Sequence, residues 1–124
     1  MLIDSLDYCQ LHKGLRVHAY CLMTSHVHLI LSVAEGNRLS DVIRDFKGYT
    51  SSRLRQLISE NNRESRRKWL LWMLERAGKR DNRNSGFQLW QQHSHPIELN
   101  TNEKVCQRLN YIHNNPVCSC WFCG

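Results

Sequence analysis

Residues 15–33, LRVHAYCLMTSHVHLILSV, decide how this chain folds. Apolar and polar residues alternate on both sides of Met23-Thr24-Ser25, a pattern that predicts two β-strands, 15–22 and 26–33, joined by a short turn. One face of the second strand carries Val27, Leu29, Leu31 and Val33, and the other carries His26, His28, Ile30 and Ser32. We expect the apolar face to meet the core and the histidine face to line a cleft.

Helical patterns flank this pair of strands. Residues 3–12 predict a short helix that ends at Gly14. After a turn at 35–37, Ser40 is the expected N-cap of a helix of about 20 residues, whose apolar side chains recur at helical spacing. The strand pair therefore lies between two helices in the sequence.

The second half of the chain predicts two more helices and one strand. A helix ends near Gly78, and the segment 87–91 alternates like a strand. Asn100 opens a capping-box pattern for a last helix, which stops before Pro116. Because no internal repeat or linker divides the chain, we expect a single domain over 1–124.

The composition favours a nucleic-acid partner. The chain has 17 Lys and Arg against 11 Asp and Glu, a formal net charge of +6, and a basic protein attracts polyanions. No apolar run approaches the roughly 20 residues that span a bilayer, and no secretory leader opens the chain, so we expect a cytoplasmic protein without a membrane partner. In that compartment the six cysteines are expected to be reduced.

His26-Val27-His28 is the first candidate for chemistry. Two histidines separated by one residue on a strand point the same way, with Cβ atoms about 6–7 Å apart. That separation suits two imidazoles that bind one divalent ion. The same spacing also occurs by chance, so the motif alone does not establish a metal site.

Tyr111 and Asn115, near the end of the last predicted helix, are the second candidate. They are four residues apart and therefore share a helix face. A tyrosine hydroxyl beside a metal ion can act as a nucleophile, because the ion polarises a phosphate and favours the phenolate. The alternative is a tyrosine that packs its ring on the core and exposes only its hydroxyl.

A basic and aromatic surface is the third candidate. The long second helix carries four cations that we expect to contact DNA phosphates: Arg44, Lys47, Arg53 and Arg55. Trp69 and Trp72 follow the basic run at 66–68, and aromatic rings can stack on unpaired bases. Their spacing is that of a buried helix face, so we expect these two tryptophans in the core.

Two segments resemble one known family. Residues 18–31, HAYCLMTSHVHLIL, resemble the signature of the HUH single-tyrosine transposases, in which a strand ends in Met-Pro-Asn and is followed by His-hydrophobic-His. The tail is similar to the REP-associated branch, with LWQQ at 89–92, HPIEL at 95–99 and YIHNNPV at 111–117. The motifs stand in the family's order, and the similarity covers most of residues 15–117.

The resemblance implies a fold and a chemistry. The implied fold is α+β, with an antiparallel sheet of the ferredoxin or RNA-recognition type packed against helices. By position, His26, His28 and Asn115 match metal ligands, and Tyr111 matches the nucleophile. The implied cofactor is Mg²⁺ or Mn²⁺. The implied partner is single-stranded or hairpin DNA, which the family cuts through a 5′-phosphotyrosine link that leaves a free 3′-hydroxyl and then rejoins. We also expect a homodimer as the candidate assembly.

The chain departs from the family pattern in three places. Thr24-Ser25 stands where Pro-Asn is common. The chain begins about where the first helix of the family does, and ends in a cysteine-rich tail soon after Asn115. We therefore expect a truncated copy that lacks an N-terminal strand and a C-terminal element.

Other activities stay open at this point. One alternative is a catalytically impaired remnant that only binds hairpin DNA. Another is a metal-dependent hydrolase that uses water as its nucleophile. In the tail, three cysteines with a nearby histidine could instead bind zinc: Cys118, Cys120 and Cys123.

Overall fold

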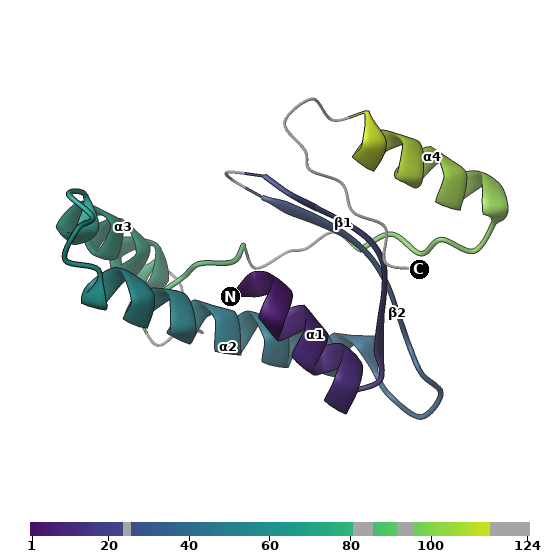
Figure 1. The fold of residues 1–124 in the computed structure, drawn as a ribbon, viewed down its shortest axis with the longest axis horizontal. Coiled ribbons are helices and arrows are strands. Elements are labelled where there is room, and N and C mark those ends of the chain that lie inside the picture. Colours follow the sequence, from purple (N-terminus) through teal and green to yellow (C-terminus); the bar gives the residue numbers. More distant parts are fainter. Residues whose placement is uncertain (24–25, 81–85, 92–95, 115–124) are drawn as a thin grey trace. The chain divides into compact units, whose positions relative to one another are not determined.

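The computed structural model describes residues 1–23, 26–80, 86–91 and 96–114 (Figure 1). The elements in chain order are α1 (Leu2–His12), β1 (Leu15–Leu22), β2 (Val27–Val33), α2 (Leu39–Glu60), α3 (Arg67–Lys79) and α4 (Asn102–His113). Helices and an antiparallel sheet therefore confirm the predicted α+β class. Predictions that concern Asn115 and the cysteine-rich tail lie outside the described residues.

The chain groups into two compact units, which we describe separately. One unit comprises Met1–Ser5 and Ser40–Ser94, and the other comprises Leu6–Leu39 and His95–Gly124. The boundary between the units crosses α1. The second unit contains the β-hairpin and α4, which are the elements that carry the histidines and Tyr111.

β1 and β2 pair antiparallel, as the alternation in residues 15–33 predicts (Figure 1). Leu15 pairs with Val33 at one end of the hairpin, and Leu22 pairs with Val27 at the other. The backbone N–H of Met23 donates to the carbonyl of His26 at 2.9 Å and closes the turn side of the hairpin. In the described part of the chain the sheet has these two strands.

A β-bulge at His18 changes which side chains share a face. The register shifts between Val17, which pairs with Leu31, and Ala19, which pairs with Ile30. Directly paired residues lie on the same face of a sheet, so Val17 and Ala19 point to opposite faces. The extra residue, His18, contacts the Ser32 hydroxyl through its Nε2 atom at 2.7 Å. The bulge therefore directs the side chains of Ala19 and Cys21 to the face of the sheet that carries His28 and Ile30.

The histidine face of β2 is covered around Ile30, although His26 at its end is exposed, which corrects the expectation that this face as a whole lines a cleft. Ala19, Cys21 and Ile30 form a buried cluster with Ile112 of α4. Ile30 is the most buried residue of β2, whereas the residues on the face that was expected to be the core are half-buried. The cause is α4, whose apolar side packs on the histidine face.

Cys21 is fully buried in this cluster. The expectation that the cysteines are reduced stays a prediction.

Two glycines act where the sequence predicts turns. Gly14 ends α1 with a φ of 65°, in the left-handed region that glycine adopts without strain. Its carbonyl accepts the N–H of Ala34 at 2.8 Å, which ties the start of β1 to the end of β2. Gly36 has a φ of 86° within the predicted turn at 35–37.

In the first unit, a segment that follows α3 and was expected to be a strand packs against α2 and α3. Residues 87–91 have no strand partner in the described chain and instead lie along α3, where Gln88 N–H donates to the Leu74 carbonyl at 3.0 Å. The approach is close enough that a Cβ at Gly78 would collide with the backbone of Gly86 and Phe87. Packing on a helix has replaced the predicted strand pairing.

Thr50 and Trp90 fasten this segment to α2. Thr50 is fully buried, and its hydroxyl donates to the Phe46 carbonyl at 2.7 Å. The same oxygen accepts the indole N–H of Trp90 at 2.9 Å, and the Trp90 and Phe46 rings lie 5.9 Å apart. The buried polar atoms are thus paired, as a packed interior requires.

Three helix details differ from the predictions. α2 begins at Leu39, so Ser40 lies inside its first turn and is not the N-cap. α4 is capped by Thr101, whose hydroxyl accepts the Lys104 N–H at 3.3 Å, rather than by Asn100. On α3, Trp69 and Trp72 are exposed and do not belong to the core. No helix in the described part of the chain is long and apolar enough to cross a membrane.

Candidate active site

His26 and His28 approach each other at the turn end of the hairpin. His26 directly precedes β2, and His28 lies within the strand opposite Cys21. The two rings stand edge to face, with centroids 4.9 Å apart. The strand period of two places both imidazoles on the same face of the hairpin, where His28 is half-buried and His26 is exposed.

Tyr111 reaches the same place from α4. Its ring stands edge to face with that of His28, with centroids 5.4 Å apart and planes at 85°. The neighbouring Ile112 is buried in the cluster on the sheet and so fixes the rotation of the helix. Tyr111 itself remains 53% exposed, which leaves it accessible to a large substrate.

His28 is electrostatically unusual. Its Nε2 atom is buried and has no hydrogen-bond partner among the described residues. Burial, together with the nearby His26 and the Arg108 guanidinium, lowers the pKa of His28 below its ordinary value of 6.5. The imidazole therefore favours its neutral form, which is the form that can bind a metal ion.

The donors at this position fit a divalent ion in part. An unpaired buried nitrogen is costly unless something occupies it, and a metal ion would satisfy Nε2 of His28. Two imidazoles do not complete a coordination shell, however, and the described residues contain no cluster of three His, Cys, Asp or Glu side chains. The remaining ligands of a bound ion would have to come from elsewhere, such as water, substrate oxygens or Asn115, which lies outside the described residues.

Arg108 lies near the candidate site, and the sequence analysis did not name it. It precedes Tyr111 by three positions on α4, so the two side chains lie on neighbouring parts of one helix face. Arg108 is exposed, and its charge acts on His28. The spacing to Tyr111 was visible in the sequence, but its proximity to His28 depends on how α4 packs against the sheet.

The four cations predicted on α2 do not form one row. Arg44, Lys47 and Arg55 lie on a similar side of the helix, whereas Arg53 is about 180° around it from Arg44. Acidic neighbours hold two of them: Arg44 pairs with Asp41 at 3.0 Å, and Arg55 pairs with Glu75 at 3.3 Å. The four cations that the sequence analysis grouped therefore do not all lie on one side of α2.

A family model described as "Transposase IS200 like" matches residues 2–76 of the chain. The matched stretch includes both histidines and ends before Tyr111. No curated protein and no solved structure was found to match the chain.

Proposed function

The chain belongs to the IS200-like transposase family, and we propose that it cleaves and rejoins single-stranded or hairpin DNA through a covalent bond to Tyr111. The observation that carries this proposal is the position of His28, which contacts both the ring of His26 and the ring of Tyr111. A nucleophile beside a potential metal site is the arrangement that phosphoryl transfer requires. The net charge of +6 favours a DNA substrate.

In the proposed step, the phenolic oxygen of Tyr111 attacks a DNA phosphorus. A bond forms between this oxygen and phosphorus, and the bond from phosphorus to the 3′-oxygen breaks. The proton lost by Tyr111 is balanced by the one that the departing 3′-oxygen gains. The products are a 5′-phosphotyrosine and a free 3′-hydroxyl, so the reverse attack rejoins DNA without an external energy source.

The residues around Tyr111 support this step in different ways. His26 and His28 would hold Mg²⁺ or Mn²⁺, which when bound withdraws electron density from the phosphate. Tyr111 is 53% exposed, which leaves room for the DNA backbone beside it. Arg108, three positions before it, adds a positive charge that would bind a phosphate oxygen and orient the strand.

Covalent capture tests the proposal directly. The full chain is incubated with a hairpin oligonucleotide and Mn²⁺, and adducts are resolved on a denaturing gel. A label on the 3′ end of the DNA should migrate with the protein, because the 5′-phosphate side stays attached. A label on the 5′ end should appear on a released fragment.

Tyr8 offers a matched control for this experiment. Like Tyr111 it is an exposed tyrosine beside a histidine, with its ring 4.5 Å from that of His12. Tyr8→Phe should form adducts as the unaltered protein does, and Tyr111→Phe should form none. Cleavage without any adduct would instead favour a hydrolase that uses water, and binding without cleavage would favour an inert DNA-binding module.

A further inference from the structure

We propose that the exposed face of α3 is a stacking platform for the bases of single-stranded DNA. This inference rests on the proposed function for its choice of DNA, but it concerns binding and not cleavage. It also reverses the expectation that the tryptophans of this helix are core residues. Three observations in the first unit carry it.

The first observation is the exposure of two large aromatic rings on one side of a helix. Trp69 is 54% exposed and Trp72 is 53% exposed, and residues three apart are neighbours on a helix surface. The opposite side of α3 holds the half-buried leucines and the buried Gly78. The helix is therefore already packed through its other side, and packing within this unit does not require the tryptophan side.

The second observation is the charge on the same face. Arg76 and Arg80 follow Trp72 at intervals of four residues and so continue its side of the helix. Neither arginine is in an ion pair with any described residue, and the guanidinium of Arg76 instead lies 5.1 Å from the centre of the Trp72 ring. Glu75, the acidic residue of α3, is paired with Arg55 of α2. Among the residues that the structure describes, the aromatic face thus carries positive charge without a compensating carboxylate.

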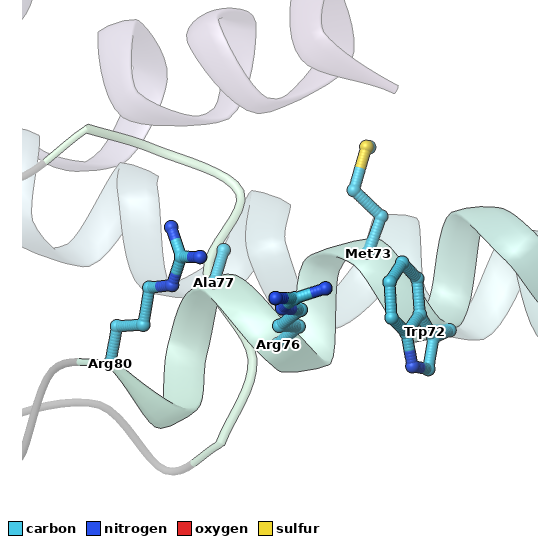
Figure 2. A pocket seen from close by; sticks show the side chains of 5 residues that line it. All are labelled: Trp72, Met73, Arg76, Ala77 and Arg80. Atoms are coloured by element: carbon cyan, nitrogen blue, oxygen red, sulfur yellow. The ribbon is translucent and has the colours of Figure 1, made fainter.

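The third observation is a hollow in this face. Figure 2 shows Arg76 between Trp72 and Arg80 along the helix, and these three side chains line the hollow together with Met73 and Ala77. Its wall combines an indole, a thioether and two guanidinium groups. These groups suit a planar base with a phosphate on either side.

Single-stranded DNA fits this combination better than a second protein surface does. Non-specific single-strand binding uses aromatic faces for bases and cations for the backbone, and α3 interleaves the two. A self-association surface would bring Arg76 and Arg80 of two copies near each other, with no described carboxylate on this face to compensate them. The charge of the face therefore favours a polyanion as its occupant.

The test uses the full chain with EDTA, so that binding is measured without cleavage. Anisotropy of a labelled oligothymidylate of about 15 nucleotides is compared with that of an abasic strand of equal length. Trp72→Ala should weaken oligothymidylate binding about five-fold or more while it changes abasic binding little, because a stacked base contributes through its ring. Trp72→Phe should restore most of the lost affinity, since phenylalanine keeps a π-face.

Arg76→Gln tests the charge of the platform. It should weaken the binding of both strands and reduce the log–log salt slope by about 0.7, the value for one phosphate contact on a single strand. Arg63→Gln is the matched control, because Arg63 is an exposed arginine in the turn before α3 and outside the platform. The log–log salt slope of Arg63→Gln should equal that of the unaltered protein.

Two results would overturn the platform. One is equal affinity of Trp72→Ala and the unaltered protein for oligothymidylate. The other is a change in oligomeric state on sedimentation of Trp72→Ala, which would make the face a surface for self-association. Neither result changes the outcome of covalent capture at Tyr111. The platform proposal and the strand-transfer proposal can therefore be refuted independently.

Discussion

The rings of His28 and Tyr111 meet edge to face, with centroids 5.4 Å apart, although one residue lies in β2 and the other in α4. Two packing events produce this contact. The bulge at His18 sets Ala19 and Cys21 beside Ile30 and His28, and Ile112 then packs into the resulting apolar patch. The position of the proposed nucleophile is therefore a consequence of core formation.

We expect His28→Ala and His26→Ala to abolish Mn²⁺ binding and cleavage together. Both imidazoles lie on one face and would share the ion, so removal of either leaves an incomplete donor set. Calorimetric titration with Mn²⁺ measures the affinity. His18→Ala is the control, since His18 contacts Ser32 and not the histidine pair. Unchanged Mn²⁺ affinity in the first two variants would refute the metal assignment.

The stability of the metal-free protein should fall as the pH decreases below 6.5. Burial lowers the pKa of His28 in the folded state, whereas the unfolded chain keeps the ordinary value of 6.5. Below 6.5 the unfolded chain binds a proton that folded His28 resists, so stability is full above this pH and is lost as the pH falls toward the folded pKa. Urea unfolding in EDTA across this range measures the effect.

His28→Gln should make this pH dependence shallower, because the titrating group is gone. His12→Gln is the matched histidine control, since His12 is exposed on α1. An identical pH profile for His28→Gln and the unaltered protein would show that His28 does not contribute.

Tyr111→Phe should eliminate cleavage and leave DNA binding, Mn²⁺ binding and the melting temperature almost unchanged. The phenyl ring keeps the contact with His28, and the lost hydroxyl belongs to a residue that is 53% exposed. If the hydroxyl instead made a buried hydrogen bond, its loss would cost about 1 kcal/mol of stability and leave cleavage intact. A melting curve and an adduct gel on the same preparation separate the two outcomes.

On α2, Lys47 and Arg55 should contribute to DNA binding through one side of the helix. The double variant Lys47→Gln/Arg55→Gln should reduce the log–log salt slope for single-stranded DNA by about 1.4, or roughly 0.7 per lost phosphate contact. Arg53→Gln is the control, because Arg53 lies about 180° around the helix from Arg44. A larger effect from Arg53 would place the DNA on the other side of α2.

Gly78→Ala and Gly48→Ala should change stability in opposite directions. A Cβ at Gly78 would collide with the backbone of Gly86 and Phe87, so we expect a loss of about 1–3 kcal/mol. A Cβ at Gly48 meets nothing within 4 Å, and alanine in an exposed helix interior should add about 0.5–1 kcal/mol. Thermal unfolding of both variants measures the sign, and a stabilised Gly78→Ala would contradict the close approach.

Some predictions remain untested by the structure. The roles of His26, His28 and Tyr111, the identity of the metal ion and a homodimeric assembly are among them. The single domain over 1–124, the absence of terminal elements and a cytoplasmic location also stay predictions.

Local patterns were sufficient for the elements that form from neighbouring residues. Alternation on both sides of Met23-Thr24-Ser25 predicted the hairpin, and helical spacing predicted α1 and α2 to within one or two residues at their starts. These features depend on backbone periodicity, which nearby side chains determine. The segment 87–91 alternates equally well, yet it lies along α3 because a strand also needs a partner that periodicity does not supply.

The sequence by itself determined the hairpin, the helices, the basic charge and the two motifs that resemble a transposase. Only the tertiary structure decided that α4 covers the histidine face, that Tyr111 meets His28 and that Trp72 is exposed. The physical reason is that each of these depends on contacts between distant segments. A one-residue bulge at His18 and the burial of Ile112 select the contacts of α4 with the hairpin, and neither is encoded in the spacing of the residues that it brings together.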